Sequence, residues 1–149
     1  MTVASARSTS RTFEQVEVGA ELEPLTLEVT ATTIVAAALA SRDFEPVHHD
    51  RAAAQASGMR DVFMNILATN GFVLRFVTDW AGPEAIVRRA SIRLGVPMYP
   101  DDTLVLTGSV TGTTAQDGGG VVVVSVRGSN ALGDHVTGTV EVDVPGGAA

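Results

Sequence analysis

The sequence predicts an α+β fold in which a curved antiparallel sheet wraps around one long central helix. Residues 63–80 place apolar side chains at helical spacing on more than one face, so the helix they form must be buried on more than one side. Residues 85–144 contain several runs of alternating apolar and polar residues between turns, which is typical of antiparallel strands. Because nothing else in the chain can cover a helix with several apolar faces, the sheet has to curve around it.

Shorter elements precede the central helix in the chain. They are a half-buried strand at the end of residues 14–29, a helix that Thr32 or Thr33 caps and that ends at Ala40, a loop over residues 41–50, and a helix over residues 51–57. Alternation predicts the strand, and hydroxyl side chains often cap helices. Pro46 favours extended geometry in the residue before it, which indicates a loop, and Gly58 ends the second helix.

Four strands follow the central helix, which ends at Gly82-Pro83. The strands are predicted over residues 85–94, 103–113, 121–130 and 135–144. Turn-forming residues separate the last three strands from one another and from the strand before them, at residues 99–102, 118–120 and 132–134. Each turn is short enough to join neighbouring antiparallel strands.

Composition excludes several classes of chemistry. The chain has no lysine, which excludes Schiff-base chemistry and the lysine-bearing phosphate loop. It has no cysteine, which excludes thiol nucleophiles, disulfides and thiolate zinc sites. The formal net charge of −7 argues against a nucleic-acid partner, because such proteins present concentrated positive charge to phosphates.

The boundaries of the domain follow from the same patterns. Residues 1–12 are predicted to be a disordered leader, residues 13–144 a single domain, and residues 145–149 a frayed tail. The longest apolar run, residues 34–40, is far shorter than a bilayer span, so we expect a cytoplasmic protein with no membrane partner. A sheet wrapped around a single helix buries little on its far side, so we also expect a dimer.

Residues 43–50 hold two of the three histidines and three carboxylates. A carboxylate and an imidazole are well suited to moving protons near neutral pH, and Asp43 and His48 are spaced so that their tips can converge on one water molecule. A solvated loop whose Asp50 caps the next helix explains the same pattern. A metal site formed by His48, His49 and Asp50 is a third interpretation, but neighbouring residues rarely aim at one ion, and we expect no metal.

The pattern Asp43-x-x-Pro46-x-His48 resembles the signature of the MaoC-like, or type 2, enoyl-CoA hydratases, which have the hot-dog fold. Residues 93–104 are similar to the strand-turn-strand of that family, and the resemblance spans roughly residues 13–144. Further segments resemble the small MaoC-like subunit of the heteromeric hydratase of bacterial steroid side-chain degradation. These segments are residues 42–44, 47–51, 65–67, 79–83 and 133–137.

The resemblance implies that the chain adds water across the double bond of an α,β-unsaturated acyl-CoA, with a steroid side chain as the acyl group. Asp43 would be the main base and His48 its acid–base partner, and the backbone N–H of Asn65 would stabilise the thioester enolate. A second MaoC-like subunit is implied, in a heterodimer or heterotetramer. Coenzyme A is part of the substrate, so no separate cofactor is expected. The chain departs from the family pattern at Arg42, Glu45 and Met64-Asn65, where glycine, asparagine and His-Gly are usual, and we expect Glu45 to point to solvent.

Arg89 and Arg93 share one face of a predicted strand and are candidates for binding the phosphates of coenzyme A, although a solvated outer face explains them equally well. His135 follows a turn and is expected to be an ordinary surface residue. Two other functions fit a hot-dog subunit. One is non-catalytic assembly. The other is acyl-CoA thioester hydrolysis, for which Asp79 is the acid on the long helix.

Overall fold

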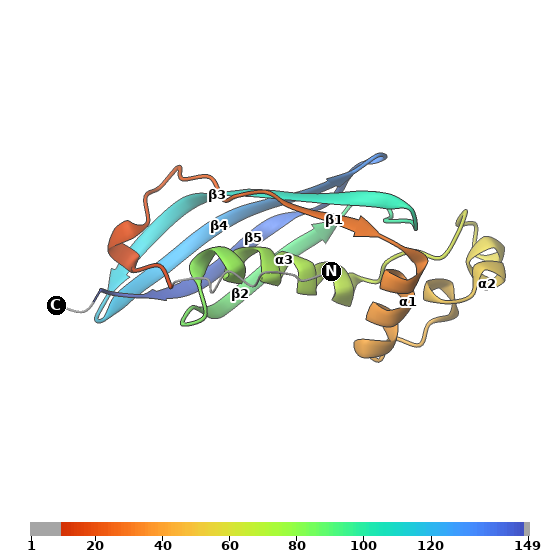
Figure 1. Cartoon of the computed structure of the whole chain (residues 1–149), viewed down its shortest axis with the longest axis horizontal. Coiled ribbons are helices and arrows are strands. Elements are labelled where there is room, and N and C mark those ends of the chain that lie inside the picture. The colour runs from red at the N-terminus through yellow and green to blue at the C-terminus, as the bar shows by residue number, and fades with distance from the viewer. Residues whose placement is uncertain (1–9, 148–149) are drawn as a thin grey trace, which may run out of the picture.

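The computed structural model describes residues 10–147 and contains a five-stranded antiparallel sheet with one long helix, α3, lying along one of its faces (Figure 1). The fold class predicted from the sequence is confirmed. The order of strands across the sheet is β1-β3-β4-β5-β2. The elements are η1 (Phe13–Gln15), β1 (Leu25–Val29), α1 (Ala31–Ala40), η2 (Pro46–His48), α2 (Arg51–Ala56), α3 (Ile66–Ala81), β2 (Ile86–Leu94), β3 (Asp102–Gln116), β4 (Gly119–Asn130) and β5 (Gly133–Pro145).

The core lies between α3 and the inner face of the sheet. On the helix it is formed by Val73, Phe76, Val77 and Ala81, which recur at helical spacing and are at most 3% exposed. Burial of one such large apolar side chain contributes about 1.5–3 kcal/mol, so this face holds the helix on the sheet. The first turn of the helix differs from the prediction, because Ile66 and Leu67 are each 50% exposed.

Two helices begin where a polar side chain caps them, and both starts differ from the predicted ones. The helix α3 begins at Ile66 and not at residue 63, because Asn65 is extended and its side chain accepts a hydrogen bond from the N–H of Ala68 at 3.0 Å. The helix α1 is capped by Thr30, whose hydroxyl accepts from the N–H of Thr33 at 3.1 Å.

Ordered contacts extend beyond both predicted domain boundaries. Residues 1–9 and 148–149 lie outside the described residues, so the leader and tail stay predictions there. Arg11, however, donates backbone and side-chain hydrogen bonds to the carbonyls of Ala81 and Trp80 at 3.0 Å. At the other end the N–H of Gly147 donates to Glu14 Oε2 at 2.9 Å, and Pro145 belongs to β5. The predicted leader and tail are therefore too long, because both segments pair with ends of the sheet and of α3.

None of the helices in residues 10–147 is long and apolar enough to cross a bilayer.

Candidate active site

The position of Asp43 is set by the way α1 ends. The N–H of Asp43 donates to the carbonyl of Ala38 at 2.9 Å, and the N–H of Arg42 donates to the carbonyl of Leu39 at 3.0 Å. These two bonds form a Schellman motif, which reverses the chain just after the helix. Arg42 occupies the left-handed position of this motif with φ of 57°. It stands where glycine is usual in the resembling family, and only glycine adopts this conformation without steric cost.

His48 is buried, with 8% of its surface exposed, and comes from the short turn η2. Its Nδ1 lies 2.7 Å from the carbonyl oxygen of Phe63, which can only accept a hydrogen bond. In the neutral imidazole the proton is therefore on Nδ1, and Nε2 carries a free lone pair. That Nε2 lies 3.5 Å from Oδ2 of Asp43. The two predicted catalytic side chains thus face each other.

The side chain of Asn65 joins this pair to the start of α3. Its Nδ2 donates to Asp43 Oδ2 at 2.9 Å and to Ser41 Oγ at 3.0 Å, while its Oδ1 caps the helix. Asn65 is only 2% exposed, so these bonds are shielded from water. The sequence analysis predicted a role for the backbone N–H of Asn65 but none for its side-chain carboxamide. Its backbone N–H has no acceptor among residues 10–147 and remains available at the N-terminus of α3.

The hydrogen bond from Asn65 is the main reason that the pKa of Asp43 is lowered from its ordinary value. Partial desolvation opposes the shift, whereas the N–H of Glu45 and the charge of a protonated His48 support it. The carboxyl group of Asp43 is therefore ionised at neutral pH.

When the imidazole of His48 is neutral, Asp43 Oδ2 and His48 Nε2 are two acceptors that can bind the same water molecule. A water oxygen placed about 2.8 Å from each acceptor atom satisfies both at once. The water then has both of its hydrogens directed at basic atoms and presents its oxygen lone pairs away from them. This is the arrangement required for general-base activation of water.

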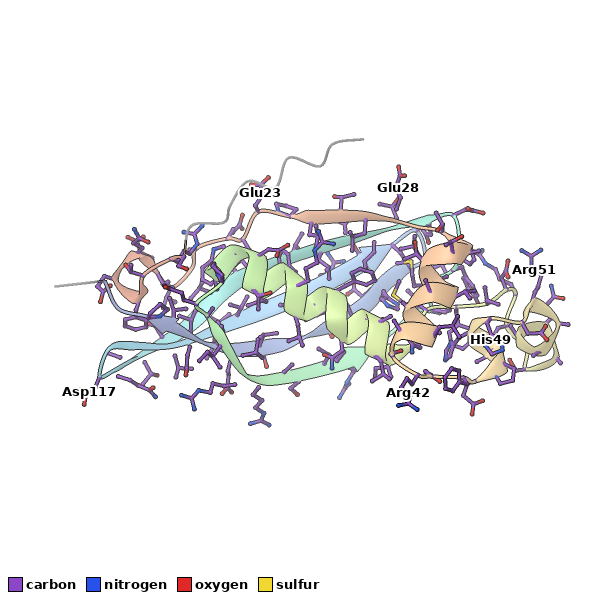
Figure 2. The ribbon with its side chains drawn as sticks, turned by 60° about the horizontal axis from the view of Figure 1, so that its bottom comes forward. Glu23, Glu28, Arg42, His49, Arg51 and Asp117 are labelled. Atoms are coloured by element: carbon purple, nitrogen blue, oxygen red, sulfur yellow. The ribbon has the colours of Figure 1, made fainter. Side chains whose placement is uncertain are left out.

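The side chains of the neighbouring loop residues do not join the pair. Glu45 is exposed, as expected, and so is His49, which is labelled in Figure 2. Asp50 caps α2 by accepting from the N–H groups of Ala52 and Ala53 at 2.8 and 3.2 Å. The capping role proposed for Asp50 is confirmed.

Arg89 and Arg93 lie on β2, at one edge of the sheet, and both are exposed. Ser91 between them is exposed as well, whereas Ala90 and Ile92 pack toward the core, so the shared face is confirmed. None of the contacts made by the Asp43–His48 pair involves either arginine.

The expectation for His135 is wrong, because this residue is only 2% exposed. Regular strand alternation would place His135 on the outer face, because its neighbour Val136 packs inward. The pairing of β4 with β5, however, shifts between Gly128 and Ser129, which pair with Val136 and Asp134. His135 is therefore the extra residue of a β-bulge, and the bulge turns its side chain into the interior. There its Nε2 lies 2.9 Å from the hydroxyl of Thr69 on α3.

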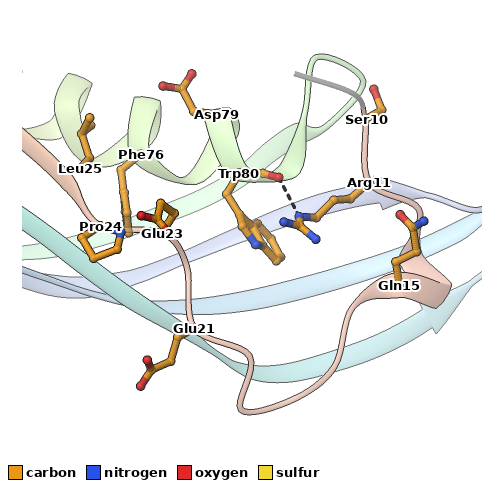
Figure 3. A pocket seen from close by; sticks show the side chains of 10 residues that line it. All are labelled: Ser10, Arg11, Gln15, Glu21, Glu23, Pro24, Leu25, Phe76, Asp79 and Trp80. Atoms are coloured by element: carbon orange, nitrogen blue, oxygen red, sulfur yellow. Dashed lines mark hydrogen bonds between the residues drawn. The ribbon is translucent and has the colours of Figure 1, made fainter. Parts of the chain in front are cut away.

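A cavity of about 1030 Å³ lies at the opposite end of α3 (Figure 3). Phe76 and Trp80 of the helix line it, together with Arg11 and the segment that leads into β1. Asp43 and His48 are not among its lining residues. Since α3 rises about 1.5 Å per residue, this cavity is roughly 20 Å from the helix start, and we do not assign the reaction to it.

Comparisons with known proteins place the chain in a family. A family model described as the MaoC-like domain matches residues 13–131, and the chain belongs to the MaoC-like family. It is 50% identical over 127 residues to the 3-oxo-4,17-pregnadiene-20-carboxyl-CoA hydratase beta subunit of Mycobacterium tuberculosis, covering 85% of this chain and 95% of that protein.

Solved structures agree with this assignment. A chain of the ChsH1-ChsH2 complex from Mycobacterium tuberculosis superposes with a TM-score of 0.80 and 51% identity, covering 86% of this chain and 98% of that one. The R-hydratase PhaJ1 from Pseudomonas aeruginosa also has a TM-score of 0.80, with 22% identity and coverage of 91% and 86%. The second likeness shows the shared hot-dog fold.

Proposed function

We propose that this chain is the catalytic small subunit of a hetero-oligomeric enoyl-CoA hydratase that acts on an α,β-unsaturated steroid side-chain acyl-CoA. The observation that carries the proposal is the 3.5 Å approach of Nε2 of the buried His48 to Asp43 Oδ2. Similarity to a pregnadiene-carboxyl-CoA hydratase beta subunit at 50% identity supports the reaction and the steroid acyl group.

In the proposed reaction, the water held by the pair attacks the β-carbon and its hydroxyl remains there. An imidazole is intrinsically a stronger base than a carboxylate, and the Asn65 hydrogen bond weakens Asp43 further as a base. We therefore assign the proton of the water to His48 Nε2, which revises the expectation that Asp43 is the main base. Asp43 then stabilises the imidazolium, and the same proton passes to the α-carbon to complete the addition.

The thioester oxygen gains negative charge as the β-carbon is attacked. The backbone N–H of Asn65 supports a role as its hydrogen-bond donor, because it is buried at the N-terminus of α3 and the helix dipole favours an anion there. The substrate would then lie with its thioester at the start of α3 and its β-carbon next to the Asp43–His48 pair.

A second MaoC-like subunit would complete the acyl pocket. Three large apolar side chains next to the site along the chain are at least half exposed in the single chain, namely Phe44 at 60% and Ile66 and Leu67 at 50%. Exposed apolar residues clustered beside a site mark a surface that another molecule covers. The similar chain from Mycobacterium tuberculosis belongs to a complex of ChsH1 with ChsH2, which supports a hetero-oligomer. We also propose that Arg89 and Arg93, both without an acidic partner among the described ion pairs, bind phosphates of coenzyme A.

The two other functions receive less support. Thioester hydrolysis would use Asp79, but this residue is exposed at the far end of α3 and pairs with Arg75 at 3.3 Å. Non-catalytic assembly does not require an ionised carboxylate held against an imidazole.

The proposal is tested by co-purifying the chain with a second MaoC-like subunit and following the loss of enoyl-thioester absorbance. Hydration of a steroid enoyl-CoA by the complex, with a much slower reaction on a short-chain enoyl-CoA, is the expected result. Release of free coenzyme A would support hydrolysis instead, and a complex with no activity on either substrate would contradict the proposal.

A further inference from the structure

A buried chain of hydrogen bonds runs from the sheet to the start of α3. His135 Nδ1 lies 2.7 Å from the carbonyl oxygen of Val96, and His135 Nε2 lies 2.9 Å from Thr69 Oγ1. Thr69 is fully buried on α3, one turn after Asn65, and its backbone N–H donates to the carbonyl of Asn65 at 3.2 Å. Asn65 in turn donates to Asp43. The chain therefore ends on the carboxylate of the Asp43–His48 pair.

The direction of these bonds follows from the acceptor at one end. The carbonyl of Val96 can only accept, so neutral His135 carries its proton on Nδ1, and Nε2 accepts the one proton of the Thr69 hydroxyl. That hydroxyl then cannot also donate to the carbonyl of Asn65, which lies 3.3 Å away. Burial lowers the pKa of His135, which keeps the ring neutral and this direction intact at neutral pH. Val96 is also bound to the strand that carries His135, because its N–H donates to the backbone carbonyl of Asp134 at 2.9 Å.

A role in packing alone does not account for the hydrogen-bonded His135 and Thr69. An apolar pair of similar size would fill the same space without the cost of burying two polar groups. The sheet also carries a bulge at His135, without which strand alternation would direct the imidazole outward. The imidazole bonds to Thr69 in the first turn of α3, directly after the N-cap Asn65.

We infer that His135 and Thr69 are positioning residues, which pin the first turn of α3 to the sheet and so hold the Asn65 carboxamide on Asp43. The inference rests on the proposed hydration reaction for its effect on turnover. Without the anchor, the helix start is free to shift, the Asn65–Asp43 hydrogen bond lengthens, and the pKa of Asp43 rises toward its ordinary value. A shift of this kind mainly lowers kcat, because the backbone N–H of Asn65 is displaced with the side chain.

The test uses the full chain in its complex with the second subunit. Thr69→Val removes the hydroxyl and keeps the shape of the side chain, whereas Thr69→Ser keeps the hydroxyl. Thr78→Val is the matched control, because Thr78 lies on the same helix, and its hydroxyl donates to the carbonyl of Leu74 at 3.0 Å, far from Asp43. The readouts are kcat and KM for the enoyl-CoA, and the pKa of Asp43 by carboxyl NMR with only this chain labelled.

Thr69→Val is expected to lower kcat about tenfold to hundredfold, with KM changing less than about twofold, and to raise the pKa of Asp43. Thr69→Ser and Thr78→Val are both expected to keep kcat and the pKa of Asp43 at the values of the parental complex. A folded Thr69→Val complex with the parental kcat and Asp43 pKa would overturn the inference, as would equal losses in Thr69→Val and Thr78→Val.

Two further measurements test the inference if Thr69→Val does not fold or if the complex has no hydratase activity. If Thr69→Val does not fold, nitrogen NMR of His135 in the unaltered complex decides, because a protonated Nε2 at neutral pH contradicts the inferred direction. If the unaltered complex hydrates no enoyl-CoA but Thr69→Val still raises the pKa of Asp43, the proposed function fails and the positioning role stands.

Discussion

Asn65 Nδ2 donates a 2.9 Å hydrogen bond to Asp43 Oδ2, while the oxygen of the same carboxamide caps α3. One side chain therefore fixes the start of the central helix and the charge of the carboxylate that faces His48. Any change that moves the first turn of α3 is transmitted to Asp43 through this residue.

Asn65→Asp separates the two roles of this side chain. Aspartate caps helices as well as asparagine does, so the start of α3 should be kept, but a second carboxylate buried beside Asp43 should lower the free energy of unfolding at neutral pH by more than about 1 kcal/mol. The donor to Asp43 is lost and a second carboxylate faces it, so the pKa of Asp43 should rise by roughly one unit or more, measured by carboxyl NMR. Asn130→Asp is the control, because Asn130 donates to the carbonyl of Pro97 at 3.0 Å and does not contact Asp43. An unchanged pKa of Asp43 in Asn65→Asp would show that the hydrogen bond does not set it.

Arg42→Gly should stabilise the fold. Arg42 has φ of 57°, and the left-handed conformation costs a residue with a Cβ about 1–2 kcal/mol, part of which glycine loses to backbone entropy. The expected gain is about 0.5–1 kcal/mol in urea unfolding. Arg42→Ala removes the guanidinium and keeps the Cβ, so it should give no such gain. An equal gain in both variants would assign the effect to charge.

The buried His135 makes stability depend on pH. Its pKa lies below the ordinary value of 6.5 in the folded chain, so the unfolded chain binds a proton at a higher pH. The stability that neutral His135 contributes is therefore fully present above that ordinary value and is lost as the pH falls toward the folded pKa. His135→Gln should be less stable at neutral pH but lose less stability between about pH 7 and about pH 5. The exposed His49 is the control, and His49→Gln should keep the parental slope in urea unfolding across this range. Equal slopes in His135→Gln and the parent would contradict the assignment.

Arg89 and Arg93 are expected to act on substrate binding. Arg89→Ala and Arg93→Ala should each raise KM for the acyl-CoA several-fold with kcat unchanged, because the phosphates of coenzyme A are bound equally before and during reaction. Arg88→Ala is the matched control, since Arg88 lies on the same strand and pairs with Asp143. A KM unchanged in the first two variants, in steady-state assays of the complex, would leave both arginines as part of a solvated face.

The patterns in the sequence predicted those features that depend on local periodicity or on a fixed motif. Helical spacing in residues 63–80 located α3, although the cap at Asn65 moved its start by three residues. The spacing of Asp43 and His48 located the two facing side chains that carry the proposed reaction. His135 was missed because one bulged residue inverts the alternation on which strand faces are assigned, and nothing in the local pattern marks a bulge.

The carboxamide of Asn65 was missed for a different reason. Its contact with Asp43 joins residues 22 positions apart, and a single sequence carries no signal for such a contact. The exposed apolar residues beside the site could not be anticipated either, because in the sequence Ile66 and Leu67 look the same as buried residues of the helix.

The proposed reaction requires Asp43 and His48 to activate one water molecule together. Asp43→Asn keeps the size of the side chain and its contact with Asn65 but removes the charge, and His48→Gln removes the imidazole. Glu45→Gln alters an exposed charge on the same loop and serves as the control.

The most direct measurement is kcat for hydration of the steroid enoyl-CoA by each reconstituted complex, with assembly checked by size-exclusion chromatography. Asp43→Asn and His48→Gln should each lower kcat by about 10²- to 10⁴-fold in complexes that assemble normally, and Glu45→Gln should retain nearly full activity. Full turnover in an assembled Asp43→Asn or His48→Gln complex would contradict the joint activation of water by these residues and leave this chain as an assembly subunit.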